Sequence, residues 1–144
     1  MERGQVVVDA SVVAKWFPVE EHSREARLLR DAYVGGLLDL AAPELLPFEV
    51  LNALRYSGAY GEDELKEAAR TLDDFQLALF RLEGELAQLA VEISMRKGVT
   101  IYDASYVALA RLLGTVLYTA DEKLIRKTGS LGVVRRISEF TLNA

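Results

Sequence analysis

Two acidic residues follow apolar runs at places where a carboxylate could act on a ligand. Asp9 comes directly after Gln5–Val8, and Asp121 comes after Thr115–Thr119 with one alanine between. Short runs rich in β-branched residues are typical of strands buried on both faces of a parallel sheet. Such sheets bind ligands beyond the carboxyl ends of their strands. We therefore predict that Asp9 and Asp121 lie at the ligand-binding edge, although either could instead cap a helix or form a turn.

Two further acidic residues belong to apolar helices. Asp103 precedes Ala104–Leu113, which is apolar nearly all round and is predicted to be a buried helix with Asp103 as its N-cap. One carboxylate oxygen can cap while the other faces a cation. Glu49 lies within the mostly apolar segment Glu44–Tyr56, where a charge is costly unless it is paired or binds a metal. The alternative is a helix edge, where Glu49 would reach water or Arg55.

Convergence of these four carboxylates would require a cation. Their mutual repulsion would raise their pKa values and destabilise the fold unless positive charge lay between them. Hard divalent cations with oxygen ligands meet this need, Mg²⁺ or Mn²⁺ above all. Asn52 lies three residues after Glu49 and so shares its side of the helix.

Strands and helices are predicted to alternate along the chain. Further strands are expected over Leu37–Ala42, over Gln76–Leu82 at an edge of the sheet, and over Val133–Ile137. A helix is expected over Val12–Phe17, capped by Ser11 and stopped by Pro18, and another is expected between its N-cap Ser23 and its stop Gly35-Gly36. Further helices are expected over Glu44–Tyr56, Glu62–Asp74, Glu85–Lys97, Ala104–Leu113 and Glu122–Thr128. This alternation implies parallel βαβ units and a three-layer α/β/α domain.

Composition excludes several kinds of site. The 144 residues suit one domain over the whole chain, 1–144, and they contain no Cys and only one His, His22. Disulfide scaffolds, Cys-ligated zinc, Cys nucleophiles and two-His nucleases are therefore excluded. No apolar run has the length of a signal peptide core or a membrane span, so we expect a cytoplasmic protein without a membrane partner.

Charge is distributed unevenly along the chain. The net charge is −5, but residues 1–95 hold 9 basic and 18 acidic residues, whereas residues 96–144 hold 8 basic and 4 acidic ones. The basic C-terminal third could face a polyanion or could be ordinary solvated surface.

The four acidic motifs together resemble those of PIN domains, and within that family most closely the VapC-type toxins of VapBC toxin–antitoxin pairs. The motifs are Asp9-Ala10-Ser11 after Val6-Val7-Val8, Glu49 with Asn52, Tyr102-Asp103-Ala104, and Thr119-Ala120-Asp121 followed by Leu124. The resemblance runs from about Val6 to Ile137. It implies a central parallel sheet of about five strands in the order 3-2-1-4-5, which would place Asp9 and Asp121 on neighbouring strands.

The resemblance also implies a function. A Mg²⁺- or Mn²⁺-dependent endoribonuclease is expected, with Asp9, Glu49, Asp103 and Asp121 as metal-binding and catalytic residues. Ser11, Thr119 and Asn52 would support the site. An RNA substrate, a cognate antitoxin and a homodimer are the expected partners. Lys15 is a weak candidate for a phosphate contact, and Glu122 and Lys123 are left without a role.

Two other functions fit parts of the pattern. Asp9 could be the nucleophile of a phosphoryl-transfer or receiver-like domain, but Ser11 stands where phosphatases of this kind need a second Asp. Alternatively, the acids could be helix caps in a non-catalytic interaction module, with the segments Glu44–Tyr56 and Glu62–Phe80 as a partner surface. Trp16 and Phe17 could stack on a base, but core or dimer packing is the expected role.

Overall fold

A five-stranded parallel sheet forms the centre of the protein. The computed structural model describes residues 4–17 and 23–142. The strands are β1 (Gly4–Val8), β2 (Leu38–Pro43), β3 (Ala78–Phe80), β4 (Leu117–Thr119) and β5 (Val134–Arg136). Their order is β3-β2-β1-β4-β5, and every neighbouring pair is parallel. The expected order and the expected edge position of β3 are confirmed.

Apolar runs form the strands at the middle of the sheet because both of its faces are covered. Val7, Val8 and Leu117 have no solvent-exposed surface, and Leu40 is almost completely buried. A strand buried on both faces needs apolar side chains in both orientations, so its sequence is continuous rather than alternating. This explains why β1 and β4 were recognisable from sequence, and why the polar residue that follows each of them stands out.

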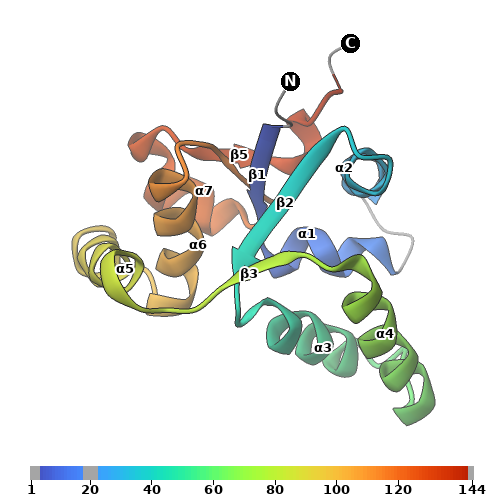
Figure 1. The fold of residues 1–144 in the computed structure, drawn as a ribbon. Helices are drawn as coiled ribbons and strands as arrows, with labels where there is room; N and C mark the ends of the chain where they lie inside the picture. Colours follow the sequence, from blue (N-terminus) through green and yellow to red (C-terminus); the bar gives the residue numbers. More distant parts are fainter. Residues whose placement is uncertain (1–3, 18–22, 143–144) are drawn as a thin grey trace.

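Helices cover both faces of the sheet (Figure 1). On one face, α6 (Ile101–Leu112) packs on β1, β2 and β4, with α5 (Gly84–Lys97) outside it and α7 (Glu122–Thr128) beside β5. The other face carries α1 (Ala10–Val13), the 3-10 helix η1 (Ala14–Trp16) and α2 (Ser23–Val34). The predicted three-layer α/β/α architecture is therefore confirmed.

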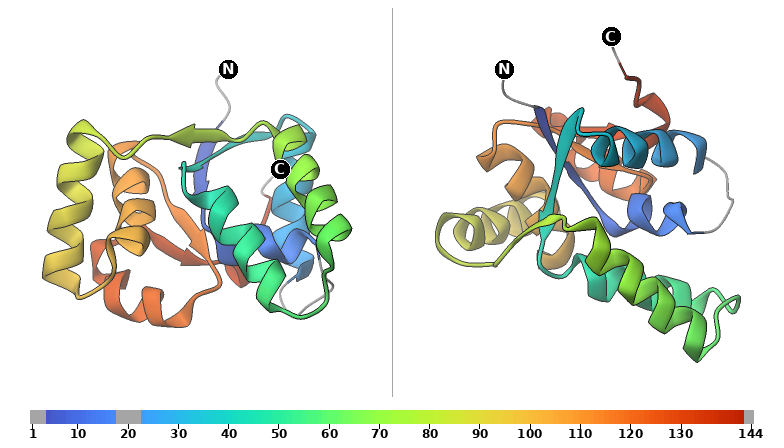
Figure 2. Two further views of the ribbon diagram at one scale, coloured as in Figure 1. Left: turned by 90° about the horizontal axis from the view of Figure 1, so that it is seen from below. Right: turned by 45° about the vertical axis from the view of Figure 1, so that its right-hand side comes forward.

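Two helices project from the edge of the sheet where its strands end. The structure places α3 (Leu46–Tyr56) directly after β2, and α4 (Glu62–Phe75) packs beside it. Figure 2 shows the pair extending away from the sheet, on the side opposite the two chain termini. Pro47 falls in the first turn of α3, where its missing N–H costs no helical hydrogen bond. This arrangement brings Glu49, in that same turn, to the carboxyl edge of the sheet.

Two predicted helix caps are wrong. Asp9, not Ser11, is the N-cap of α1, because its carboxylate accepts a hydrogen bond from the Val12 N–H. Thr100, not Asp103, caps α6, since that helix begins three residues earlier than predicted. Asp103 lies in the first turn instead, where the positive end of the helix dipole still favours a carboxylate.

The remaining predicted elements agree with the structure to within a few residues. As predicted, Trp16 packs in the core: it is buried, it donates from Nε1 to the Ala26 carbonyl at 2.8 Å, and it meets Phe75 edge to face. Pro18, the expected stop of the first helical turn, and His22 lie outside the described residues. Within residues 4–17 and 23–142, none of the helices combines the length and apolarity that crossing a bilayer requires.

Candidate active site

Asp9 lies at the carboxyl end of β1 and is surrounded by hydrogen-bond donors. Its side chain is 6% exposed. Oδ1 accepts from the Ser11 hydroxyl at 2.5 Å and from the Val12 N–H at 3.3 Å, and the Thr119 hydroxyl donates to Oδ2. A buried carboxylate is tolerated when hydrogen bonds replace its water shell. These donors, from helix α1 and from strand β4, fix the orientation of Asp9.

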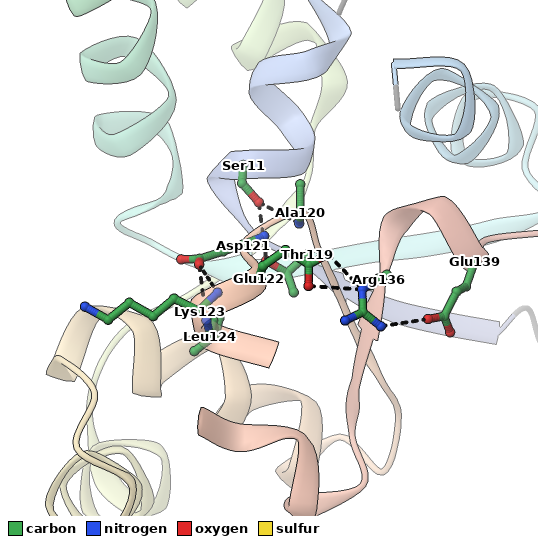
Figure 3. A network of polar contacts seen from close by, with 9 residues as sticks. All are labelled: Ser11, Thr119, Ala120, Asp121, Glu122, Lys123, Leu124, Arg136 and Glu139. Atoms are coloured by element: carbon green, nitrogen blue, oxygen red, sulfur yellow. Dashed lines mark hydrogen bonds and ion pairs between the residues drawn. The ribbon is translucent and has the colours of Figure 1, made fainter. Parts of the chain in front are cut away.

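The hydroxyls of Ser11 and Thr119 join the end of β1 to the end of β4. Ser11 Oγ accepts from the Ala120 N–H at 2.9 Å, and Thr119 Oγ1 accepts from the Asp121 N–H at 3.0 Å. Figure 3 shows the first of these contacts, with Ser11 above the turn that follows β4. Each hydroxyl thus donates a hydrogen bond to Asp9 and accepts one from a backbone N–H group. Ser11 and Thr119, which are predicted to support a metal site, both contact Asp9, and their role at a metal stays a prediction.

Asp121 is the N-cap of α7. Its Oδ1 accepts from the N–H groups of Lys123 and Leu124 at 3.0 and 3.1 Å. Glu122 points the opposite way, toward Arg136, whose Nε lies 2.8 Å from Glu122 Oε1 (Figure 3). Asp121, and not its acidic neighbour, therefore faces the site.

Glu49 is held by a residue that the sequence did not single out. The Tyr106 hydroxyl of α6 donates to Glu49 Oε1 at 2.7 Å, across the boundary between α6 and α3. Glu49 is half-buried, so the helix-edge alternative is only partly right: it reaches Tyr106. A signal existed, because a tyrosine buried in an apolar helix usually needs a partner for its phenol oxygen. The sequence does not say which partner.

Burial and neighbouring charge raise the pKa of three site carboxylates. Burial raises the pKa of Asp9 to about 6, against the hydrogen bonds from Ser11, Thr119 and Val12, and the charge of Asp121 raises it further. Burial also raises the pKa of Glu49, with Tyr106 lowering it and Asp103 raising it.

Asp103 receives opposing influences. Burial and the charge of Asp121 raise its pKa, whereas a hydrogen bond with Thr100 and the charges of Lys123 and Lys127 lower it. The repulsions therefore link the four acids in series: Asp9 with Asp121, Asp121 with Asp103, and Asp103 with Glu49. The structure brings all four predicted acids to one edge of the sheet.

A small hollow of about 90 Å³ lies on one side of this cluster. Its lining includes Asp103 and Asp121 together with Lys123 and Lys127. Lys127 is anchored by a 2.9 Å hydrogen bond from Nζ to the Gly98 carbonyl. Gly98 ends α5 with a φ of 67°, in the left-handed region that favours glycine. The hollow therefore combines two carboxylates with two ammonium groups, and Lys123 and Lys127 were not assigned from sequence.

The donor set fits a divalent cation chemically. In the described ranges, no three Asp, Glu, His or Cys side chains are already grouped as a metal site. The hydrogen bonds above use Oδ1 of Asp121 and Oε1 of Glu49, which leaves Asp121 Oδ2 and Glu49 Oε2 to turn toward a cation beside the Asp103 carboxylate, itself hydrogen-bonded to Thr100. Raised carboxylate pKa values are what a cation would relieve. Oxygen donors of this type suit Mg²⁺ or Mn²⁺.

Two other predicted residues lie on the helical segments that follow β1 and β2. Asn52 is exposed on α3, one turn after Glu49, and Lys15 is half-buried in η1. Both remain predictions.

The fold and this edge define a class of protein, an α/β domain with a carboxylate cluster where the strand order reverses. The sequence profile of the PIN domain matches residues 6–130, and the chain belongs to this family. It is 37% identical over 132 residues to the ribonuclease VapC3 of Pyrobaculum aerophilum, covering 88% of this chain and 97% of that protein. It is 33% identical over 89 residues to the exonuclease VapC9 of the same organism, covering 62% and 67%.

Comparison of structures agrees with this assignment. A toxin–antitoxin complex from Klebsiella pneumoniae aligns over 94% of this chain and 99% of that one, with a TM-score of 0.68 and 17% identity. At this identity the likeness supports the fold alone.

Proposed function

We propose that the protein is a divalent-metal-dependent ribonuclease and the toxin of a toxin–antitoxin pair. The observation that carries the proposal is the series of four repelling carboxylates, Asp9, Asp121, Asp103 and Glu49, at the carboxyl edge of the sheet. The nuclease names of both VapC relatives support the same chemistry.

In the proposed mechanism, Asp9, Glu49, Asp103 and Asp121 hold Mg²⁺ or Mn²⁺. A cation held there would supply an activated water as the nucleophile and positive charge to offset the negative charge of the phosphate. Ser11 and Thr119 orient Asp9, and Tyr106 orients Glu49. Lys123 and Lys127 face the hollow beside Asp103, where they can bind phosphate oxygens of RNA. No histidine base is needed.

The proposed partners are RNA, an antitoxin and a second copy of the chain, and the proposed location is the cytoplasm.

Between α3 and α4 lies a groove of about 780 Å³ lined partly by Leu51, Tyr60 and Leu65. Phe48, at its margin, is 78% exposed. We propose this groove for protein contacts, since an exposed apolar patch of this kind commonly marks an interface. The toxin–antitoxin complex among its structural relatives supports an antitoxin as the occupant.

The two alternative functions are not favoured. A phosphoryl-accepting Asp9 would need a second Asp two residues later, and Ser11 occupies that position and donates a hydrogen bond to Asp9 instead. A purely structural role as helix caps accounts for Asp9 and Asp121. It does not account for Glu49 or Asp103, which cap no helix and repel each other.

Cleavage of single-stranded and structured RNA by the purified protein tests the proposal. Mg²⁺ or Mn²⁺ should support cleavage, EDTA should abolish it, and Asp9→Asn and Asp103→Asn should each lower it by a hundredfold or more, on the order of 10²–10³. Asp74→Asn, an exposed acid on α4, is the matched control and should retain wild-type activity. Internal cuts would identify an endonuclease. Cleavage that survives both EDTA and Asp9→Asn would contradict the assigned site, and absence of both cleavage and Mn²⁺ binding would reject the nuclease.

A further inference from the structure

A second hollow, which the proposed chemistry does not use, lies beside the carboxylate cluster. It has a volume of about 400 Å³ and is lined partly by Leu45, Phe80, Leu82, Ile101 and Tyr102. Its walls come from the end of β2, the end of β3 and the first turn of α6. The lining is apolar except for Glu44, Ser105 and the hydroxyl of Tyr102. The volume lies within the range of about 300–1,000 Å³ typical of small-molecule pockets, and it exceeds that of one nucleobase.

One turn of α3 and one turn of α6 separate this hollow from the carboxylates. The Glu49 N–H donates to the Leu45 carbonyl at 3.1 Å, so Leu45 lies one turn before Glu49. Tyr102 likewise lies one turn before Tyr106, the residue that holds Glu49. Residues one turn apart have Cβ atoms about 5–6 Å from each other. The hollow therefore lies next to the carboxylates, because its lining residues Leu45 and Tyr102 are each one helical turn from Glu49 or from the residue that holds it.

Tyr102 provides an aromatic face at the rim. It is 64% exposed although it directly precedes Asp103, and its backbone is held by the Ser105 hydroxyl, which donates to the Tyr102 carbonyl at 2.6 Å. A large aromatic side chain exposed beside a charged site loses hydrophobic burial unless a ligand covers it. Nucleobases stack on such side chains in single-stranded RNA complexes.

Glu44 adds a polar group to this apolar lining. It lies between β2 and α3, and its N–H donates to the Phe80 carbonyl at 2.8 Å, which fixes the backbone at the pocket wall. A carboxylate accepts hydrogen bonds from amino groups of bases and repels phosphate and carbonyl oxygens. Glu44 therefore favours a base with an exocyclic amino group over uracil.

We infer that this hollow binds one unpaired nucleobase of the RNA next to the cleaved phosphate, with Tyr102 stacking on the base and Glu44 selecting an amino-bearing base. The inference rests on the proposed ribonuclease function. It assigns Tyr102 and Glu44 as substrate-binding residues, distinct from the acids that hold the cation.

Binding of short, fluorescently labelled single-stranded RNA in EDTA tests the subsite without cleavage. The probes are oligo(A), oligo(C) and oligo(U). Tyr102→Ala should weaken binding of oligo(A) and oligo(C) about tenfold, because stacking contributes about 1–3 kcal/mol per base. Tyr102→Phe should bind within about twofold of wild type, since it keeps the ring. Glu44→Gln should remove the preference for oligo(C) over oligo(U).

The matched control is Tyr56→Ala, which removes another exposed tyrosine, 71% exposed, at the far end of α3. It should bind all three probes like wild type. Equal affinity of Tyr102→Ala and Tyr56→Ala would overturn the subsite. A change of oligomeric state in Tyr102→Ala on gel filtration would also overturn it, because the hollow would then be an interface between copies.

Cleavage separates failure of this inference from failure of the proposed function. The assay uses Mn²⁺ and an RNA in which the wild-type cut has been mapped. Replacing the nucleotide beside the cut with an abasic one should slow cleavage by the wild type about tenfold, and it should not slow cleavage by Tyr102→Ala beyond the loss that this variant already shows. Fully multiplicative losses would reject stacking while leaving the nuclease intact. Tyr102-dependent binding without any metal-dependent cleavage would retain the subsite and reject the nuclease.

Discussion

The Tyr106 hydroxyl donates to Glu49 Oε1 across 2.7 Å, and this single bond ties α6 to α3 at the carboxylate cluster. Burial is the main reason that the pKa of Tyr106 is raised, and the charge of Glu49 adds to it. The phenol therefore stays protonated and remains a donor over the pH range in which the protein folds. This hydrogen bond holds Glu49, the acid that α3 contributes to the cluster, whereas the other three acids lie at the ends of β1 and β4 or on α6.

Tyr106→Phe should lower both stability and activity. A hydrogen bond to a charged group contributes about 1.5–3 kcal/mol, so the free energy of unfolding should fall by about 2 kcal/mol at pH 7. RNA cleavage should fall about tenfold through kcat, because Glu49 loses its fixed orientation. Urea denaturation and single-turnover kinetics measure the two effects. Tyr118→Phe, which removes a phenol oxygen from the half-buried tyrosine of β4, is the control. Equal effects of the two variants would show that Tyr106 plays no special role.

The sequence predicted the positions of the acids better than it predicted their partners. β1 ends in two consecutive buried valines and β4 in buried and half-buried residues, so these largely apolar runs mark the two strand ends that precede Asp9 and Asp121. The strand order came from the family resemblance rather than from periodicity. The partners of the acids depend on tertiary packing: Tyr106 meets Glu49 57 residues away, and Thr119 meets Asp9 110 residues away.

The misassigned caps have a related cause. Ser11 and Asp9 are both good N-caps, and local sequence does not decide between them. The Ser11 hydroxyl instead accepts from the N–H of Ala120, the residue after β4, and donates to Asp9 itself. At α6, Thr100 precedes Ile101 and Tyr102, whose exposed apolar side chains hid the first turn of an otherwise buried helix.

Asp9→Asn should make the metal-free protein more stable above pH 6. The pKa of Asp9 is about 6 in the folded state against 3.8 for the free group, so the folded state binds the proton more tightly. The stability contributed by the protonated form is complete below pH 4 and is lost as pH rises through 6, at a cost of about 3 kcal/mol. The amide carries no charge and avoids this loss.

Urea denaturation in EDTA between pH 4 and pH 8 measures this difference. The gap between Asp9→Asn and wild type should grow over that range, whereas Asp74→Asn should follow the wild type throughout. A variant less stable than wild type at pH 8 would contradict the raised pKa.

A divalent cation should stabilise the protein most at high pH. Ionised carboxylates bind the cation and also repel one another without it, so Mn²⁺ should raise the melting temperature more at pH 8 than at pH 5. At a concentration about 100-fold above its Kd, a cation stabilises by about 2.7 kcal/mol. Differential scanning fluorimetry with Mn²⁺ or EDTA measures the shift. Asp103→Asn should reduce it strongly and Asp74→Asn should not, and an undiminished shift in Asp103→Asn would place the cation elsewhere.

Thr119→Val should destabilise the protein, and more at pH 8 than at pH 4. Thr119 is completely buried, and its hydroxyl both donates to Asp9 Oδ2 and accepts from the Asp121 N–H at 3.0 Å. Valine keeps the shape but leaves a buried carboxylate oxygen and a backbone N–H without this partner, at a cost of about 2–3 kcal/mol. The loss is larger at pH 8 because Asp9 is ionised there, and the lost hydrogen bond stabilises a buried carboxylate more than a neutral carboxyl group. Thr119→Ser restores the hydroxyl and should cost only about 1 kcal/mol for the missing methyl group. Urea denaturation at both pH values compares the pair, and a pH-independent loss in Thr119→Val would mean that packing, and not the hydrogen bond to Asp9, is what Thr119 supplies.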